Sequence, residues 1–173
     1  MKGGIKQGIM RGYRDVPVKL TQEFGDWLST MGWDIWFTGT FGNGYFIKDP
    51  YMARVRIEKW LYSQFCNGKR PVSHMLAIEK FHQTDFVHGH MLIRGLGDVP
   101  YVEIGESWRK HNYGGMCKVM GYDIGLGANY YITKYTTKDM MDWNIQIHPK
   151  HKNQELESQW VKESAREIIN DKR

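Results

Sequence analysis

The sequence has few of the features that mark a secreted, membrane-bound or zinc-ribbon protein. It contains only two cysteines, Cys66 and Cys117, which are far apart and form no CxxC pair. This spacing excludes a disulfide scaffold and a zinc ribbon and fits a reducing compartment. No stretch is apolar for long enough to cross a membrane, and residues 1–15 lack the apolar core of a signal peptide. We therefore expect a cytoplasmic protein.

The chain also lacks a GxxxxGK[ST] phosphate-binding loop, so it does not carry a nucleotide-driven motor. With 173 residues, of which 41% are hydrophobic and 25% charged, it is long enough for one soluble domain with a buried core. Aromatic residues reach 14%, which is high. Their flat rings either fill the core or stack on unpaired bases, and by composition alone a large aromatic core is the simpler explanation.

The formal net charge of +5 is unevenly distributed along the chain. Residues 1–20 carry five Lys or Arg side chains against a single Asp. This segment is either a basic arm that contacts phosphate groups or a solvated terminus without a partner. The rest of the chain has mixed charge and does not require a strong non-specific nucleic-acid binder.

Apolar periodicity and turn residues divide the chain into alternating helices and strands. Helices are predicted at residues 18–32, 50–66, 102–112 and 128–139, and strands at 33–42, 72–81, 87–94 and 114–123. The short link 82–86 predicts a hairpin, so antiparallel pairing and an α+β fold are expected. We expect a single domain, 1–173, with a core of about 17–140 and a charged helical C-terminal tail of about 141–173.

A candidate metal site lies in the predicted hairpin. His88 and His90 stand two residues apart in VHGHMLIR, so on a strand both imidazoles point to the same face. Glu79 lies on the preceding strand and can approach that face if the two strands pair. Two imidazoles and a carboxylate with open positions suit Mg²⁺ or Mn²⁺. The alternative is a polar stripe of histidines that faces solvent.

The helix predicted at 128–139 carries a second group of reactive side chains. Tyr131, Lys134, Tyr135 and Lys138 stand at i, i+3, i+4 and i+7 and share one helix face. A nearby ammonium favours the phenolate and so activates a tyrosine as a nucleophile, and lysine can bind phosphate. Alternatively, both tyrosines are buried by their rings and the lysines extend to solvent.

Three blocks appear in a set order: WFTGTF (36–41), IEKFHQTDFVHGHMLI (78–93) and YITKYTTKD (131–139). This order resembles that of replication initiators of the HUH superfamily, over residues 33–139. Mobilisation relaxases place their tyrosine before the histidines, so the chain looks like the Rep type. The resemblance implies a central, about five-stranded antiparallel sheet flanked by helices, of the ferredoxin or RRM-like kind. It also implies a divalent metal ion at Glu79, His88 and His90; Gly89 replaces the family's hydrophobic residue, but that position faces away from the metal.

The tyrosine motif YxxK occurs twice, at Tyr131 and at Tyr135. Initiators of isometric phages look similar, with two tyrosines spaced by four that alternate as nucleophiles. Certain plasmid initiators instead have an acid at the first position and one catalytic tyrosine at the second. Tyr135 matches under both comparisons, and Tyr131 is active only in a two-tyrosine enzyme. Tyr130 points elsewhere on the helix and is expected to be structural.

The resemblance implies a site-specific endonuclease and strand transferase that acts on single-stranded DNA and initiates rolling-circle replication. Tyr135 or Tyr131 would attack the phosphate, leaving a 5′-phosphotyrosine and a free 3′-OH, with Lys138 and Lys134 assisting. The expected cofactor is Mg²⁺ or Mn²⁺, and the expected substrate is a single-stranded or hairpin origin. A host helicase and polymerase are the expected partners, in the host-cell cytoplasm if the gene is phage- or virus-encoded, and no membrane is involved.

Three other functions fit parts of the sequence. A transposase would use the same chemistry at the ends of a mobile element, although such enzymes usually have one tyrosine. A non-catalytic single-strand binder would use the aromatic residues for stacking, and a metal hydrolase would activate water without a covalent intermediate. Candidate DNA-binding residues, chosen on charge alone, are Arg14, Lys48, Arg54 and Arg70.

Overall fold

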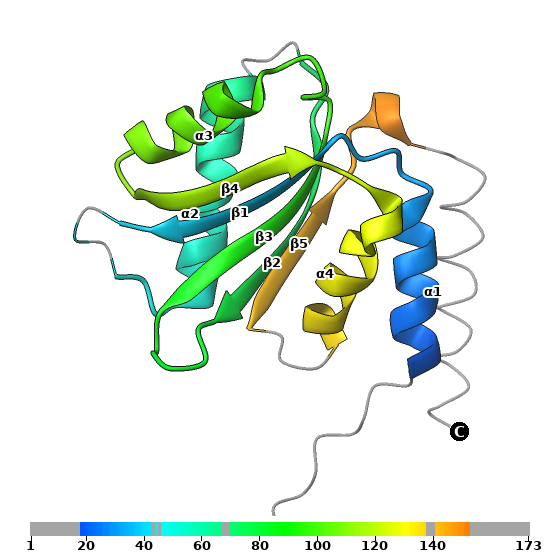
Figure 1. Ribbon diagram of the computed structural model, residues 1–173, viewed down its shortest axis with the longest axis horizontal. Coiled ribbons are helices and arrows are strands. Elements are labelled where there is room, and N and C mark those ends of the chain that lie inside the picture. The colour runs from blue at the N-terminus through cyan, green and yellow to red at the C-terminus, as the bar shows by residue number, and fades with distance from the viewer. Residues whose placement is uncertain (1–17, 43, 45, 67–69, 138–140, 153–173) are drawn as a thin grey trace, which may run out of the picture.

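The fold is built on a five-stranded antiparallel sheet with the strand order β4-β1-β3-β2-β5 (Figure 1). The structure, a computed structural model, describes residues 18–42, 44, 46–66, 70–137 and 141–152. The strands are β1 (Ile35–Phe41), β2 (Ser73–Lys80), β3 (Val87–Arg94), β4 (Gly114–Gly121) and β5 (Asp142–Gln146). The α+β expectation, with a central antiparallel sheet flanked by helices, is therefore confirmed.

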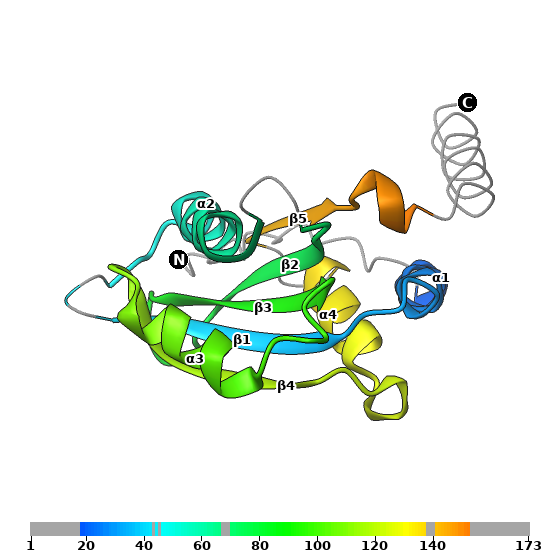
Figure 2. The ribbon, with the colours of Figure 1, turned by 90° about the horizontal axis from the view of Figure 1, so that it is seen from above.

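Four α-helices cover the sheet, two on each face (Figure 2). They are α1 (Val18–Ser29), α2 (Pro50–Leu61), α3 (Tyr101–Lys110) and α4 (Ala128–Thr137). A π-helical turn (Tyr62–Cys66) continues α2, and short 3-10 turns lie at Ile124–Leu126 and Pro149–His151. No helix within the described ranges combines the length and apolar character that a membrane span needs.

Alternation along the strands gives the sheet two separate cores. Ile35 and Phe37 of β1 point to the face covered by α2 and α3, where Trp60 and Trp108 are fully buried. Trp36, between them in sequence, points to the face covered by α1 and α4. Because successive side chains on a strand project to opposite faces, a strand covered on both sides needs a continuous apolar run. This requirement explains the apolar runs in β1, β2 and β3.

The position of α4 is set by a close contact with α1. A Cβ atom at Gly25 would overlap the ring of Tyr130, so only glycine lets the two helices approach this closely. The Tyr130 hydroxyl donates to the carboxylate of Asp26, and Asn129 donates from Nδ2 to the Gly25 carbonyl at 2.8 Å. Tyr130 is thus a packing residue, as expected, and it faces α1 while Tyr131 faces the sheet.

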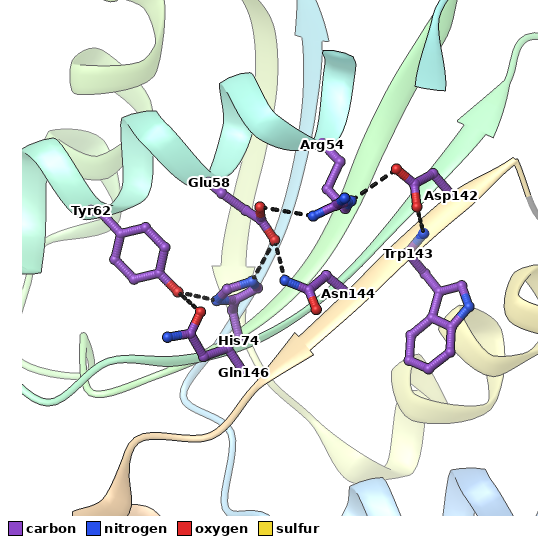
Figure 3. A network of polar contacts seen from close by, with 8 residues as sticks. All are labelled: Arg54, Glu58, Tyr62, His74, Asp142, Trp143, Asn144 and Gln146. Carbon is purple, nitrogen blue, oxygen red and sulfur yellow. Dashed lines mark hydrogen bonds and ion pairs between the residues drawn. The ribbon is translucent and has the colours of Figure 1, made fainter. Parts of the chain in front are cut away.

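The edge strand β5 is held to α2 and to the π-helical turn that continues it by three polar contacts (Figure 3). They join Arg54 Nε to Asp142 Oδ2 at 2.8 Å, Asn144 Nδ2 to Glu58 Oε1 at 2.6 Å, and Tyr62 Oη to Gln146 Oε1 at 2.7 Å. Four residues of an α-helix rise about 6.0 Å and two residues of a strand about 6.8 Å, so side chains at i and i+4 of the helix lie at nearly the same spacing as side chains at i and i+2 of the strand. Because the two spacings are similar, polar contacts can form at three successive positions along the helix and the strand.

The structure corrects the predicted end of the core. Residues 142–146 form β5, so the core extends beyond residue 140 and the helical tail expected from about 141 is wrong for this part. DWNIQ was missed because its polar residues at every second position resemble a solvated segment. The helix expected at 50–66 is α-helical only to Leu61, and residues 153–169, expected to be helical, lie outside the described residues.

Candidate metal centre

Strand pairing brings Glu79, His88 and His90 together on one face of the sheet. In the β2–β3 register Glu79 lies opposite His88, and Ala77 lies opposite His90. Residues at i and i+2 of a strand share a face, and directly paired residues of neighbouring strands do so too. The three side chains therefore lie on the face that also carries Trp36 and Leu92, next to α4. The sequence predicted this grouping.

The three ligand atoms form a small triangle. Nε2 of His90 lies 3.0 Å from Nε2 of His88 and 3.0 Å from Oε2 of Glu79, and the third side, from His88 Nε2 to the same oxygen, is 3.3 Å. If a proton lies between two of these atoms, the third atom still directs a lone pair at them with no proton in between. A cation at the centre of the triangle removes that conflict.

The size of the triangle fits a metal ion. Ligands at about 2.1 Å from an octahedral ion such as Mg²⁺ stand about 3.0 Å apart when they are adjacent. The three edges observed here are close to that value. Within the described ranges this is the one group of three or more His, Cys, Asp or Glu side chains whose geometry could hold a metal ion. Two imidazoles and one carboxylate accept several divalent ions, so the donor set does not identify the metal.

Burial keeps the histidines in the form that binds metal. The side chains of Glu79, His88 and His90 are 12%, 11% and 8% exposed. Burial lowers the pKa of His88, and burial together with the neighbouring His88 lowers the pKa of His90 to about 3. Both imidazoles are therefore neutral at pH 7, and neutral imidazole is the metal-binding form.

Residues of β1 and of the hairpin surround the histidines. Thr38, which lies opposite His90 in the β1–β3 register, places its hydroxyl 3.0 Å from His90 Nδ1. Trp36 stacks on the His90 ring at 5.5 Å between centroids, and Phe81 lies 4.3 Å from the His88 ring. A hydrogen bond at Nδ1 orients the ring and leaves Nε2 to face the position that a metal ion would occupy.

The roles of Thr38, Trp36 and Phe81 were not predicted from the sequence. The signal was present, because WFTGTF alternates and so places Thr38 and Trp36 on one face of β1. Using it required the knowledge that β1 pairs with β3, which local sequence does not supply. His88 differs from His90, because its buried Nδ1 has no hydrogen-bond partner in the described part of the chain.

Tyr131 is next to the metal centre. Its ring meets the His90 ring edge-on at 5.4 Å and the Trp36 ring at 5.7 Å, and 42% of the residue is exposed. It is neither buried in the core nor remote from the histidines. Lys134 and Tyr135 belong to α4, but their side chains are not among the described ones, and Lys138 lies outside the described residues.

Three of the four basic residues chosen on charge alone have acidic partners in the fold. Arg54 binds Asp142 and Glu58 on the opposite face of the sheet from the metal centre, and Arg70 forms a two-pronged contact with Asp98. Lys48 lies 3.7 Å from Asp85 on an exposed loop. Arg14 lies outside the described residues.

Comparisons with models of protein families, with curated proteins and with solved structures found no match.

Proposed function

We propose that the chain is a metal-dependent endonuclease that nicks and rejoins single-stranded DNA through a tyrosine nucleophile, as an initiator of rolling-circle replication. The observation that carries the proposal is the contact of Tyr131 with His90, at one corner of the Glu79–His88–His90 triangle. A phenol beside a metal-binding group is the arrangement that a phosphotyrosine reaction needs. The order of the three sequence blocks, which resembles that of HUH initiators, supports the same proposal.

Glu79, His88 and His90 would hold Mg²⁺ or Mn²⁺. When bound, such an ion polarises a phosphoryl oxygen and offsets the charge that develops during attack on phosphorus. The role of the three residues is to fix the ion on two paired strands, where backbone hydrogen bonds limit movement of the ligands. Trp36, packed against both His90 and Tyr131, holds the phenol beside that position.

The reaction is a transesterification. A bond forms between a tyrosine Oη and phosphorus while the bond from phosphorus to the 3′ oxygen breaks. The phenol loses its proton and the leaving 3′ oxygen gains one, so the products are a 5′-phosphotyrosine and a free 3′-OH. The reverse attack by a 3′-OH rejoins the strand without nucleotide hydrolysis. Tyr131 and Tyr135 are the candidate nucleophiles, and Lys134 and Lys138 are the candidate phosphate-binding groups.

The test is formation of a covalent adduct. Labelled single-stranded oligonucleotides that tile the replicon encoding this chain are incubated with the protein and Mn²⁺, then separated on denaturing gels. Tyr131→Phe, Tyr135→Phe, the double variant and His90→Ala are run in parallel. We expect an adduct that disappears with EDTA, with His90→Ala and with the double variant, and the single variants identify the tyrosine that is used.

Tyr130→Phe is the matched control, because Tyr130 is 41% exposed and Tyr131 is 42% exposed, yet Tyr130 contacts Asp26 of α1. Its adduct should equal that of the wild type. Cleavage without an adduct would replace the proposal with a metal hydrolase that activates water. Binding without cleavage, unchanged by EDTA, would leave a non-catalytic single-strand binder. Cleavage confined to transposon ends would indicate a transposase.

A further inference from the structure

Three phenylalanines, two exposed and one half-buried, lie near one another beside the candidate metal centre. Phe81 follows β2 and packs on the His88 ring, and its backbone N–H donates to the carbonyl of Phe86 at 3.0 Å. The Phe86 ring lies 4.9 Å from that of Phe46 in the loop between β1 and α2. Phe46 is 67% exposed and Phe81 38%. We call Phe46, Phe81 and Phe86 the aromatic patch.

The exposure of these rings is not explained by packing. The aromatic residues of the α2–α3 core, Phe37, Trp60 and Trp108, are completely buried. Scattered single apolar residues on a surface are ordinary, but adjoining phenyl rings exposed beside a buried polar centre are not. A backbone hydrogen bond ties the β1–α2 loop to the sheet beside the patch, because the N–H of Val87, at the start of β3, donates to the carbonyl of Ile47 at 3.0 Å. The rings are therefore fixed in position rather than carried on an unattached loop.

Lysines border the patch. Lys48 Nζ lies 5.7 Å from the centre of the Phe86 ring, and Lys48 and Lys80 share a single carboxylate, that of Asp85. Two cations against one anion leave the border with excess positive charge. Flat aromatic faces combined with a cationic border are what a single-stranded nucleic acid needs, because its bases stack on the rings and its phosphates meet the lysines.

We infer that the aromatic patch is a base-stacking subsite, which receives unpaired bases next to the phosphate held at the metal centre. This inference rests on the proposed function and adds the path of the strand to it. The strand leaves the metal centre over Phe81 and continues across Phe46 in the β1–α2 loop. Stacking does not distinguish one base from another, so the subsite contributes affinity and not sequence selection.

The experiment measures binding without cleavage. Fluorescence anisotropy in EDTA compares a labelled dT oligomer with an abasic oligomer of equal length, which keeps the phosphates and lacks the bases. We expect wild-type protein to bind the abasic oligomer more weakly by about 10-fold or more. Phe46→Ala and Phe81→Ala should each weaken dT binding by about 10-fold while the abasic oligomer binds as before.

Phe46→Ala is the informative variant, because a ring that is 67% exposed can be removed without opening the core. Phe46→Trp should restore binding, since indole also stacks. Tyr101→Ala removes a ring that is 46% exposed at the start of α3 and is the control expected to bind as wild type. Equal dT binding by wild type and the phenylalanine variants would overturn the subsite and leave the endonuclease proposal intact. Absence of any single-strand binding by the wild type would overturn both.

Discussion

Two glutamate–histidine clusters lie on opposite faces of the sheet, and they differ in how their polar atoms are paired. His74, fully buried on β2, has Glu58 at 3.2 Å from Nε2 and Tyr62 at 3.2 Å from Nδ1. Glu58 also accepts from Arg54 and Asn144, so each member of this cluster has complementary partners (Figure 3). At Glu79, His88 and His90, three ligand atoms converge on one point instead.

This difference in the pairing of polar atoms distinguishes a structural network from a candidate binding site. A buried polar network whose members are all paired stabilises one packing arrangement. A buried triangle of two imidazole nitrogens and a carboxylate oxygen is costly without a cation, because hydrogen bonds cannot satisfy all three contacts. The arrangement of partners, and not the presence of a Glu–His pair, therefore indicates where a ligand belongs.

The largest expected effect is that substitutions in the two clusters change different properties, stability in one and metal affinity in the other. His74→Ala should lower the free energy of unfolding by about 3 kcal/mol, because it breaks a buried charged network, and should leave metal affinity unchanged. His90→Ala should weaken Mn²⁺ binding by at least about 100-fold and cost less stability. Urea unfolding in EDTA and calorimetric Mn²⁺ titration measure the two quantities. Equal loss of metal affinity in both variants would contradict the distinction.

Metal should stabilise the fold through one cluster only. Mn²⁺ at about 100 times its Kd should raise the free energy of unfolding by about 2.7 kcal/mol, because the folded state alone contains the assembled triangle. The same increment is expected in His74→Ala, from its lower starting value. At the same Mn²⁺ concentration, His90→Ala should show about 0.4 kcal/mol of it or less. Urea unfolding with and without Mn²⁺ measures the increment, and a full increment in His90→Ala would show that the ion binds elsewhere.

A smaller effect is expected at Thr38, whose hydroxyl orients His90. Thr38→Val keeps the shape of the side chain and removes the hydrogen bond to Nδ1, so Mn²⁺ affinity should fall by about 10- to 100-fold. Thr38→Ser should retain most of it. Thr40→Val is the matched control two residues along β1, because the Thr40 hydroxyl donates to the Met116 carbonyl. Equal affinities of the two valine variants would exclude an orienting role.

The smallest effect concerns acid stability of the closed network. Burial by itself raises the pKa of Glu58, but hydrogen bonds from His74 and Asn144 and the charges of His74 and Arg54 outweigh it, so the pKa is lower than its usual 4.5. A lowered pKa in the folded state contributes stability above about pH 4.5, and that stability is lost as pH falls further. Unfolding in EDTA at pH 6 and pH 4 should therefore show a smaller loss in Glu58→Gln than in wild type.

Sequence alone predicted most of the sheet and the grouping of the three candidate metal ligands, for a definite reason. His88 and His90 are two residues apart on one strand, and Glu79 is reached across a short hairpin, so local pattern suffices. Thr38 joins them through a strand distant in sequence, and the pairing of β1 with β3 is not a local property. The role of His74 and the strand β5 were not predicted, because their polar side chains form hydrogen bonds with residues of α2. Such pairing cannot be recognised before the position of the helix is known.

Because of the strand order, we expect the two halves of the candidate site to unfold locally at different rates. The candidate metal ligands stand on β2 and β3, which have a paired strand on each side, whereas α4 with Tyr131 rests on the outside of the sheet. Amide protons of β3 should exchange with solvent only when the whole domain unfolds, and those of α4 should exchange sooner. If the proposed reaction occurs, the attached DNA strand would travel on the element that opens first, while the residues that would hold the ion stay assembled.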